Sequence, residues 1–265
     1  MSHSMNKFWG IVYKMIDNSD VVLEVIDARF PSICRSNQLE KYVNAHSNVN
    51  LLIALNKSDL VPREHTDAWI AWFKSKGFHA VAVSAKKRLG TQILRKNILM
   101  TSRRKTALVA VVGFPNTGKS SLINALRGKS AAATAPIPGK TRGEQKVKVS
   151  NSIRMFDTPG VIPVKLPEKH NLLLGLTAIT RIRDLEAAAL EFYDIANKLS
   201  PGVIEQHYAL EDGEDILENI ALKHNKVQKK GVPNTYEAAR ILLSDHVAGK
   251  FVLRESVERP LRLMY

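Results

Sequence analysis

The stretch that most constrains the fold of this chain is GFPNTGKSS, which runs from Gly113 to Ser121. It matches the spacing G-x-x-x-x-G-K-[ST], in which glycines let the backbone turn closely around phosphate oxygens. Residues 107–112 before it form an apolar run of strand length, and residues 121–126 after it have helical periodicity. A glycine-rich turn before an ordinary helix is the simpler alternative, but the flanking strand and helix favour a phosphate-binding loop.

The polar residues of this loop have roles that their chemistry predicts. Lys119 is expected to reach the terminal phosphates and to assist catalysis there, and Ser120 to place its hydroxyl on Mg²⁺. The nucleotide-binding residues predicted in this loop are Asn116, Thr117, Gly118, Lys119, Ser120 and Ser121.

Charge is distributed unevenly along the 265 residues, which carry a formal net charge of +14. Residues 1–170 contain 27 Lys and Arg against 11 Asp and Glu, whereas residues 171–265 contain 12 against 14. Segment 86–105 holds eight basic residues and no acidic one, and segment 127–154 holds seven against one. Such clusters predict contact with a polyanion, most often nucleic acid, although a solvated basic surface is the alternative.

Several classes of protein are disfavoured by composition. The longest apolar runs are far shorter than the ~18 residues of a membrane span, so no membrane contact is expected. Cys34 is the single cysteine, which excludes an internal disulfide and fits a reducing, cytoplasmic location. The eight histidines show no zinc-binding spacing. We also expect a monomer.

Strand-like and helix-like segments alternate through the first 170 residues. The predicted strands are 20–27, 49–55, 78–83, 107–112, 145–149 and 153–156, and the predicted helices are 5–18, 36–43, 66–76, 91–101 and 121–126. This alternation predicts an α/β fold with a mostly parallel sheet covered by helices on both faces. Segment 130–143, rich in Ala, Pro, Gly and Thr, is predicted to be a mobile loop.

The strand pattern stops beyond about residue 171. Helical periodicity continues over residues 172–199, 215–224, 236–243 and 245–253. We therefore predict two domains: a sheet domain over residues 1–170 and a helical domain over residues 171–265.

Two short motifs before the phosphate loop predict guanine recognition. Asn56-Lys57-Ser58-Asp59 fits N-K-x-D, where the Asp59 carboxylate can accept both the N1–H and the N2 amine of guanine. Adenine has no donors there and would leave the carboxylate unpaired. Asn56 is expected to tie this loop to the phosphate loop. The second motif, Ser84-Ala85-Lys86, fits S-A-K, with the Ala85 N–H expected at guanine O6.

Two weaker candidates follow the phosphate loop. Asp157-Thr158-Pro159-Gly160 fits D-x-x-G, in which Asp157 would hold a water of Mg²⁺ and the Gly160 N–H would sense the terminal phosphate. Thr141 is a candidate to cap Mg²⁺ when GTP is bound.

Together these motifs resemble those of the GTPase superfamily, but in a rotated order in which N-K-S-D and S-A-K precede the phosphate loop. The chain is similar to the circularly permuted GTPases of the YlqF/YawG family, whose D-A-R-x-P-x-x-x-R pattern appears as Asp27 to Arg35. The resemblance covers about residues 5–170. It implies a P-loop GTPase fold, GTP and GDP as ligands, and a GTP-hydrolysing switch that assists assembly of the large ribosomal subunit by binding rRNA or the pre-subunit.

Two positions refine what the resemblance implies. Val161 stands where many members of the superfamily carry a water-orienting Gln, so we expect slow hydrolysis alone and acceleration by the ribosomal partner. Asn116 matches a residue that related GTPases use to hold K⁺ beside the phosphates, or else only stabilises the loop. Two alternatives remain: an RNA-binding scaffold with structural GTP, or a GTPase of another pathway such as tRNA modification or signalling.

Overall fold

The computed structural model describes residues 3–46, 48–128, 146–156, 166–210, 215–258 and 260–261. The chain divides into two compact units, one of residues 1–164 with 256–265 and one of residues 165–255. This division falls a few residues before the predicted boundary at 170. It also assigns the carboxyl-terminal segment to the unit that contains the sheet, which the sequence pattern did not indicate.

A six-stranded sheet with the order β3-β2-β1-β4-β6-β5 forms the centre of the first unit. All neighbouring strands are parallel except β5 and β6, which pair antiparallel as the sequence predicted. Strand β1 lies in the interior of the sheet and is buried along its whole length. The strands are β1 (Val21–Asp27), β2 (Asn50–Asn56), β3 (His79–Ala82), β4 (Ala107–Val112), β5 (Lys146–Lys148) and β6 (Ile153–Phe156).

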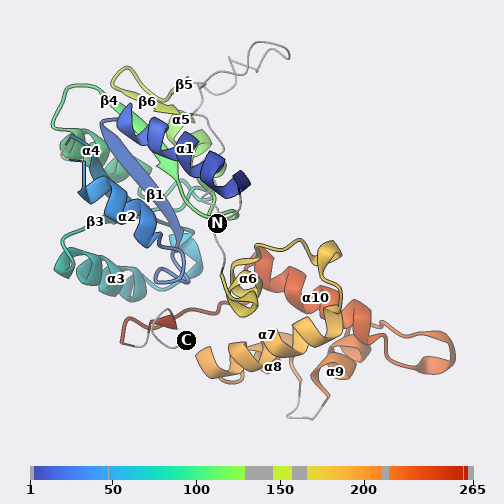
Figure 1. Cartoon of the computed structure of the whole chain (residues 1–265). Helices are drawn as coiled ribbons and strands as arrows, with labels where there is room; N and C mark the ends of the chain where they lie inside the picture. The colour runs from blue at the N-terminus through green and yellow to red at the C-terminus, as the bar shows by residue number, and fades with distance from the viewer. Residues whose placement is uncertain are drawn as a thin grey trace. The chain divides into compact units, whose positions relative to one another are not determined.

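Helices cover both faces of this sheet, as predicted. Helices α1 (His3–Asp17), α2 (Asn37–Asn44) and α3 (Arg63–Ser75) lie on one face, and α4 (Thr91–Ser102) and α5 (Lys119–Arg127) on the other (Figure 1). The Ser36 hydroxyl caps α2 by accepting a hydrogen bond from the Leu39 N–H, which confirms its predicted start. Helix α3 starts three residues earlier than predicted, directly after Pro62, whose fixed φ of −59° suits that place.

The parallel arrangement determines where the loops with functional motifs lie. Strands β1, β2 and β4 run in the same direction side by side, and β3 continues this order beyond β2. Their carboxyl ends therefore share one edge of the sheet. The loops that follow them, 28–36, 57–62, 83–90 and 113–118, start from this edge.

The second unit is helical. Helix α7 (Leu185–Leu199) packs against α6 (Glu168–Leu174), α8 (Val203–Tyr208) and α10 (Thr235–Ala248), and α10 also packs against α9 (Ile216–Lys223). Within the described residues of the chain, no helix is long and apolar enough to cross a membrane.

Several predicted helix bounds in this unit were wrong. The predicted helix over 172–199 is two helices, because Gly175 ends α6 in a left-handed conformation and the Asp184 carboxylate caps α7. The third helical region, predicted in two parts over 236–243 and 245–253, is one helix, α10, which ends at Gly249 with φ of 72°. Helix α8 was not predicted.

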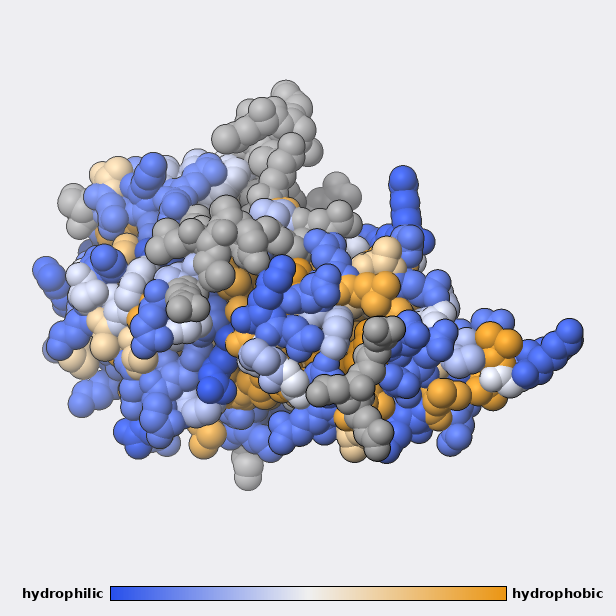
Figure 2. Space-filling model, turned by 90° about the horizontal axis from the view of Figure 1, so that it is seen from below, coloured by the Kyte–Doolittle hydropathy of each residue, from blue (hydrophilic) through white to orange (hydrophobic). Residues whose placement is uncertain are grey.

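The segment between α9 and α10 turns back on itself through a bridge between Val227 and Pro233. Val227 and Val232 are each about half exposed, and they lie next to the basic residues Lys229 and Lys230 in the chain. This segment lies at the right of Figure 1, and Figure 2 shows hydrophobic and hydrophilic residues side by side at the same edge.

Candidate functional site

The loop between β4 and α5 has, at two positions, a backbone that residues with a Cβ rarely adopt. Gly113 has φ of 148°, and a Cβ there would lie 2.3 Å from the Val25 carbonyl oxygen on β1. Gly118 has φ of 92°, and its Cβ would lie 2.3 Å from Nδ2 of Asn56. The two glycines therefore allow the loop to pack directly against β1 and against the end of β2.

Lys119 begins α5 and turns back over this loop. Its ammonium donates to the carbonyl oxygens of Gly113 at 3.0 Å and Phe114 at 2.6 Å. Burial lowers the pKa of Lys119 to about 8, because the charged form loses solvent. A partly desolvated ammonium whose hydrogen-bond partners among the described residues are two neutral carbonyl oxygens is suited to bind an anion that enters the loop.

The side chain of Asn56 connects three loops at this edge. Its Nδ2 donates to the Thr117 carbonyl oxygen at 2.8 Å, and its Oδ1 accepts from the Ala85 N–H at 3.0 Å. Asn56 is 2% exposed, so both contacts are shielded from water. The structure thus brings together the N-K-S-D, S-A-K and phosphate loops, although they are far apart in the chain.

The N-K-S-D loop leaves β2 through a left-handed residue. Lys57 has φ of 63°, and Ser58–Leu60 then form a single helical turn in which Asp59 is half-buried. The Ser58 N–H donates to the Val83 carbonyl oxygen at 3.2 Å, which joins this turn to the end of β3. Asp59 is therefore carried on a short, anchored turn at the sheet edge where loops 28–36, 57–62, 83–90 and 113–118 start, which we call the loop edge.

The S-A-K loop is held by a backbone bridge between Ser84 and Leu89 and by the Ser84 side chain. Ser84 is fully buried, and its hydroxyl accepts from the Lys87 N–H at 3.0 Å, so this side chain stabilises the turn. The Ala85 N–H, which we predicted at guanine O6, donates to Asn56 in this structure. Lys86 is exposed.

Ser120 and Ser121 lie exposed in the first turn of α5, and Asn116 is exposed in the loop with φ of 61°. Thr141, Asp157, Gly160 and Val161 lie outside the described residues, as does the predicted loop 130–143. Among the described residues, no group of three or more His, Cys, Asp and Glu side chains could hold a metal ion. In this part of the chain Ser120 alone remains as a predicted Mg²⁺ ligand, and its hydroxyl is the hard oxygen donor that Mg²⁺ prefers.

Two charged residues at this edge were missed as site residues. Asp27 and Arg29, 2% and 1% exposed, form an ion pair with 2.9 Å between Oδ2 and Nη2, and the Lys57 ammonium lies 2.8 Å from the same Oδ2. The sequence showed them only as part of a family pattern. Charged residues that directly follow an apolar strand were the available signal.

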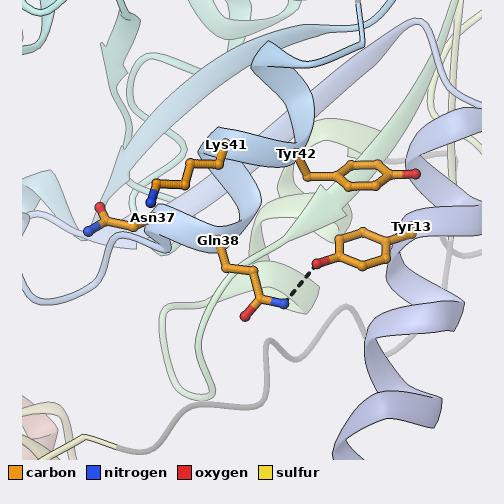
Figure 3. Close-up of a pocket in the computed structure, with 5 residues that line it drawn as sticks. All are labelled: Tyr13, Asn37, Gln38, Lys41 and Tyr42. Carbon is orange, nitrogen blue, oxygen red and sulfur yellow. Dashed lines mark hydrogen bonds between the residues drawn. The ribbon is translucent and has the colours of Figure 1, made fainter.

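A groove of about 560 Å³ lies between α1 and α2. Figure 3 shows the rings of Tyr13 and Tyr42 stacked across it, with centroids 3.9 Å apart, and the Gln38 amide donating to the Tyr13 hydroxyl. The ring centroid of Tyr13 also lies 5.3 Å from that of Trp9, and the ring centroid of Tyr42 lies 4.2 Å from that of His46. The stacked pair of Tyr13 on α1 and Tyr42 on α2 therefore joins these two helices.

Comparison with known proteins agrees with the geometry of the loop edge. A family model described as "RsgA GTPase" matches residues 9–167, and one described as "50S ribosome-binding GTPase" matches residues 108–230. The chain belongs to the circularly permuted GTPases. The rotated motif order and the P-loop GTPase fold, both predicted from the sequence, are therefore confirmed.

Two solved structures and two curated proteins illustrate this membership. YlqF of T. maritima, solved with GNP and with GDP, matches with TM-scores of 0.69 and 0.70 and identities of 25% and 26%. The matches cover 96% and 94% of this GTPase and 99% of YlqF. An uncharacterised GTP-binding protein of Methanocaldococcus jannaschii, MJ1464, is 36% identical over 91% of this chain. Nucleolar GTP-binding protein 2 of Neurospora crassa is 36% identical over 92%. The matched regions span 65% and 41% of these two relatives.

Proposed function

We propose that this permuted GTPase binds GTP and GDP at the loop edge, hydrolyses GTP, and acts as a switch in assembly of the large ribosomal subunit. The observation that carries the proposal is the Asn56 side chain, which joins the phosphate loop to both purine loops. A site that must read a base and a phosphate chain at once needs these loops in a fixed arrangement.

Nucleotide recognition divides between two parts of the edge. The backbone of loop 113–118 and the Lys119 ammonium would bind the phosphates, and the Asp59 carboxylate would accept the two guanine donors. Asn56, Lys57, Ser84, Ala85 and Lys86 would frame the base, whereas Asn116, Thr117, Gly118 and Ser121 would surround the phosphates.

Hydrolysis needs groups that stabilise charge on the terminal phosphate. Mg²⁺ bound by Ser120, Thr141 and a water on Asp157 would neutralise part of that charge. Lys119, Thr141 and the Gly160 N–H would act on the terminal phosphate, with K⁺ at Asn116 as a further candidate. Because Val161 cannot orient a water, we propose that turnover is slow until the ribosomal partner binds.

The basic segment 86–105 supports a ribosomal partner. Seven of its eight basic residues are exposed, and Arg95 donates to the Leu126 carbonyl oxygen. Relatives are described as nucleolar, and one matching family as binding the 50S ribosome. We therefore propose rRNA or the pre-subunit as partner, a monomer as the working form, and the compartment of ribosome assembly, the cytoplasm in a cell without a nucleolus, as its location.

Base selection is tested by Asp59→Asn, which replaces an acceptor by an amide that offers donors. We expect GDP affinity to fall by about 100-fold or more, and XDP, whose C2 carbonyl accepts a hydrogen bond, to bind better than GDP. Titration with fluorescent GDP and XDP measures both. If the wild-type protein does not prefer GDP to ADP, the proposed function is wrong.

The ribosomal role is tested by co-sedimentation with large subunits in GDP and in a non-hydrolysable GTP analogue, over a range of salt concentrations. We expect stronger association with the GTP analogue and loss of this difference in Lys119→Ala, because phosphate can no longer be sensed. Maturation of subunits by Lys119→Ala without bound nucleotide would favour the RNA-binding scaffold instead. No association in any state would favour a GTPase of another pathway.

A further inference from the structure

The buried residue Asp27 has more partners than neutralising its charge requires. Its Oδ1 accepts from the Arg29 backbone N–H and Nε, both at 3.0 Å, and its Oδ2 accepts from Arg29 Nη2 at 2.9 Å. This bidentate pair with a 1% exposed arginine already compensates the carboxylate. The fourth contact, from the Lys57 ammonium at 2.8 Å, therefore matters more for Lys57 than for Asp27.

Lys57 lies at the start of the loop that carries Asp59. Its backbone is left-handed, a conformation that is unfavourable for a side chain with a Cβ by about 1 kcal/mol or more. An attractive contact for the side chain offsets this cost and fixes the direction in which the loop leaves β2. The Lys57 side chain is 25% exposed and that of Asp27 is 3% exposed. Solvent therefore screens the attraction between these two charges less than it would at the surface.

The backbone reinforces this contact on both sides. Asp27 and Asn56 are paired across β1 and β2, and the Ala28 N–H donates to the Asn56 carbonyl oxygen at 2.8 Å. On the other side, Nε2 of His65 on α3 lies 2.9 Å from the Ala28 carbonyl oxygen. The carboxylate of Asp27 is thus held at a fixed point beside the base of the N-K-S-D loop.

We propose that Asp27 is a positioning residue for guanine selection: it anchors Lys57, and through Lys57 it sets where the Asp59 carboxylate meets the base. This inference rests on the proposed function, because it concerns the same nucleotide site. Asp27 itself does not touch the nucleotide. Arg29 keeps Asp27 ionised and in place, which gives the D-A-R part of the sequence pattern a physical role.

The same pattern supplies a matched control on α2. Arg35 donates to Glu40 through Nε at 2.7 Å and Nη2 at 2.6 Å, and its guanidinium lies against the rings of Trp72, Phe73 and Phe78. Glu40 is 6% exposed, and within the described residues its carboxylate bonds Arg35 and not the N-K-S-D loop. Glu40→Gln therefore weakens a buried carboxylate–arginine pair of the same kind, away from the base.

The experiment measures GDP and IDP affinity for the full chain carrying Asp27→Asn, Lys57→Met, both changes, or Glu40→Gln. IDP lacks the N2 amine, so the ratio of the two affinities reports the Asp59 contact. We expect Asp27→Asn and Lys57→Met each to weaken GDP binding about tenfold and to reduce the preference for GDP over IDP. The GDP affinity of the double variant should be no lower than that of the single variant with the lower affinity. The GDP affinity of Glu40→Gln should stay within twofold of wild type.

The inference is overturned if Asp27→Asn binds GDP within twofold of wild type, or if the two losses multiply in the double variant. Should Asp27→Asn fail to fold, Lys57→Met alone tests the inference. Unchanged GDP affinity, or an unchanged ratio of GDP to IDP affinity, in this variant would show that the Asp27–Lys57 contact does not position Asp59. In steady state, Asp27→Asn should raise KM for GTP and leave kcat within twofold. A wild-type protein without a preference for GDP over ADP would instead contradict the proposed function itself.

Discussion

Both units bury polar side chains, but these side chains connect different things. In the first unit, Asn56 and Asp27 join loops at one edge of the sheet. In the second, Nε2 of His246 lies 2.8 Å from the Leu173 carbonyl oxygen, and the Tyr208 hydroxyl donates to Asp245 at 3.0 Å. Those contacts join helices to one another. In this protein, the buried polar side chains at the predicted nucleotide site connect loops, whereas those of the helical unit connect helices.

The largest expected effect is a loss of stability that is confined to the helical unit. Phe192 on α7 is fully buried, with its ring centroid 4.6 Å from that of His246 and 6.4 Å from that of Phe251. We expect Phe192→Ala to destabilise the helical unit by about 3–5 kcal/mol through the cavity it leaves. GDP affinity should stay unchanged because the site lies in the other unit.

Thermal unfolding followed with and without GDP measures both quantities. Leu190→Ala is the control, since this side chain on the same helix is 46% exposed and should cost little. A loss of GDP affinity in Phe192→Ala that Leu190→Ala does not share would show that the two units depend on each other.

The next effect tests whether close loop packing, and not backbone strain alone, makes the nucleotide site. Gly118→Ala would place a Cβ against Asn56 and strain a left-handed backbone, together about 3 kcal/mol, so GDP affinity should fall about 100-fold. Gly77→Ala has a similar φ of +83° and nothing within 4 Å of its Cβ. It should lower stability by about 1 kcal/mol and leave GDP affinity unchanged. Equal losses of GDP affinity in both variants would contradict this account; titration with fluorescent GDP measures them.

The smallest effect concerns protons. Burial holds the pKa of Lys119 at about 8 in the nucleotide-free protein, and bound phosphates should raise it because they favour the charged form. Binding of GDP at pH 8 should therefore take up about half a proton, and affinity should fall as pH rises through 8. Calorimetry in two buffers of different ionisation enthalpy measures this uptake. Lys119→Arg, which stays charged, should show none; equal uptake in both proteins would assign the proton to another group.

The sequence predicted the sheet unit well because the loops of this unit need specific residues at specific positions. Gly113 and Gly118 stand where any Cβ would collide, and Asn56 has an amide that can donate to one loop while it accepts from another. The ligand roles of Asp59, Ser120 and the residues after 128 stay predictions, and the Ala85 N–H has a partner that the motif did not foretell.

The helical unit was harder to predict because periodicity does not reveal where a helix breaks. Gly175 ends α6 inside a stretch whose apolar spacing continues, and the start of α7 depends on one carboxylate cap at Asp184. Conversely, Ser244 in the middle of α10 resembles a break but is tolerated, because tertiary packing outweighs its weak helix propensity. The Asp27–Lys57 contact was missed because it joins residues 30 positions apart.

The contact between Asn56 and Thr117 spans 61 positions of the chain. In the permuted order, the loops predicted to read the base, 57–62 and 83–90, are synthesised before the predicted phosphate loop at 113–118. With the proposed site, a growing polypeptide would not hold a nucleotide at both ends until loop 113–118 has emerged and packed against Asn56. Capture of the nucleotide would then report that strands β1 to β4 have assembled, because β5 and β6 are synthesised after this loop.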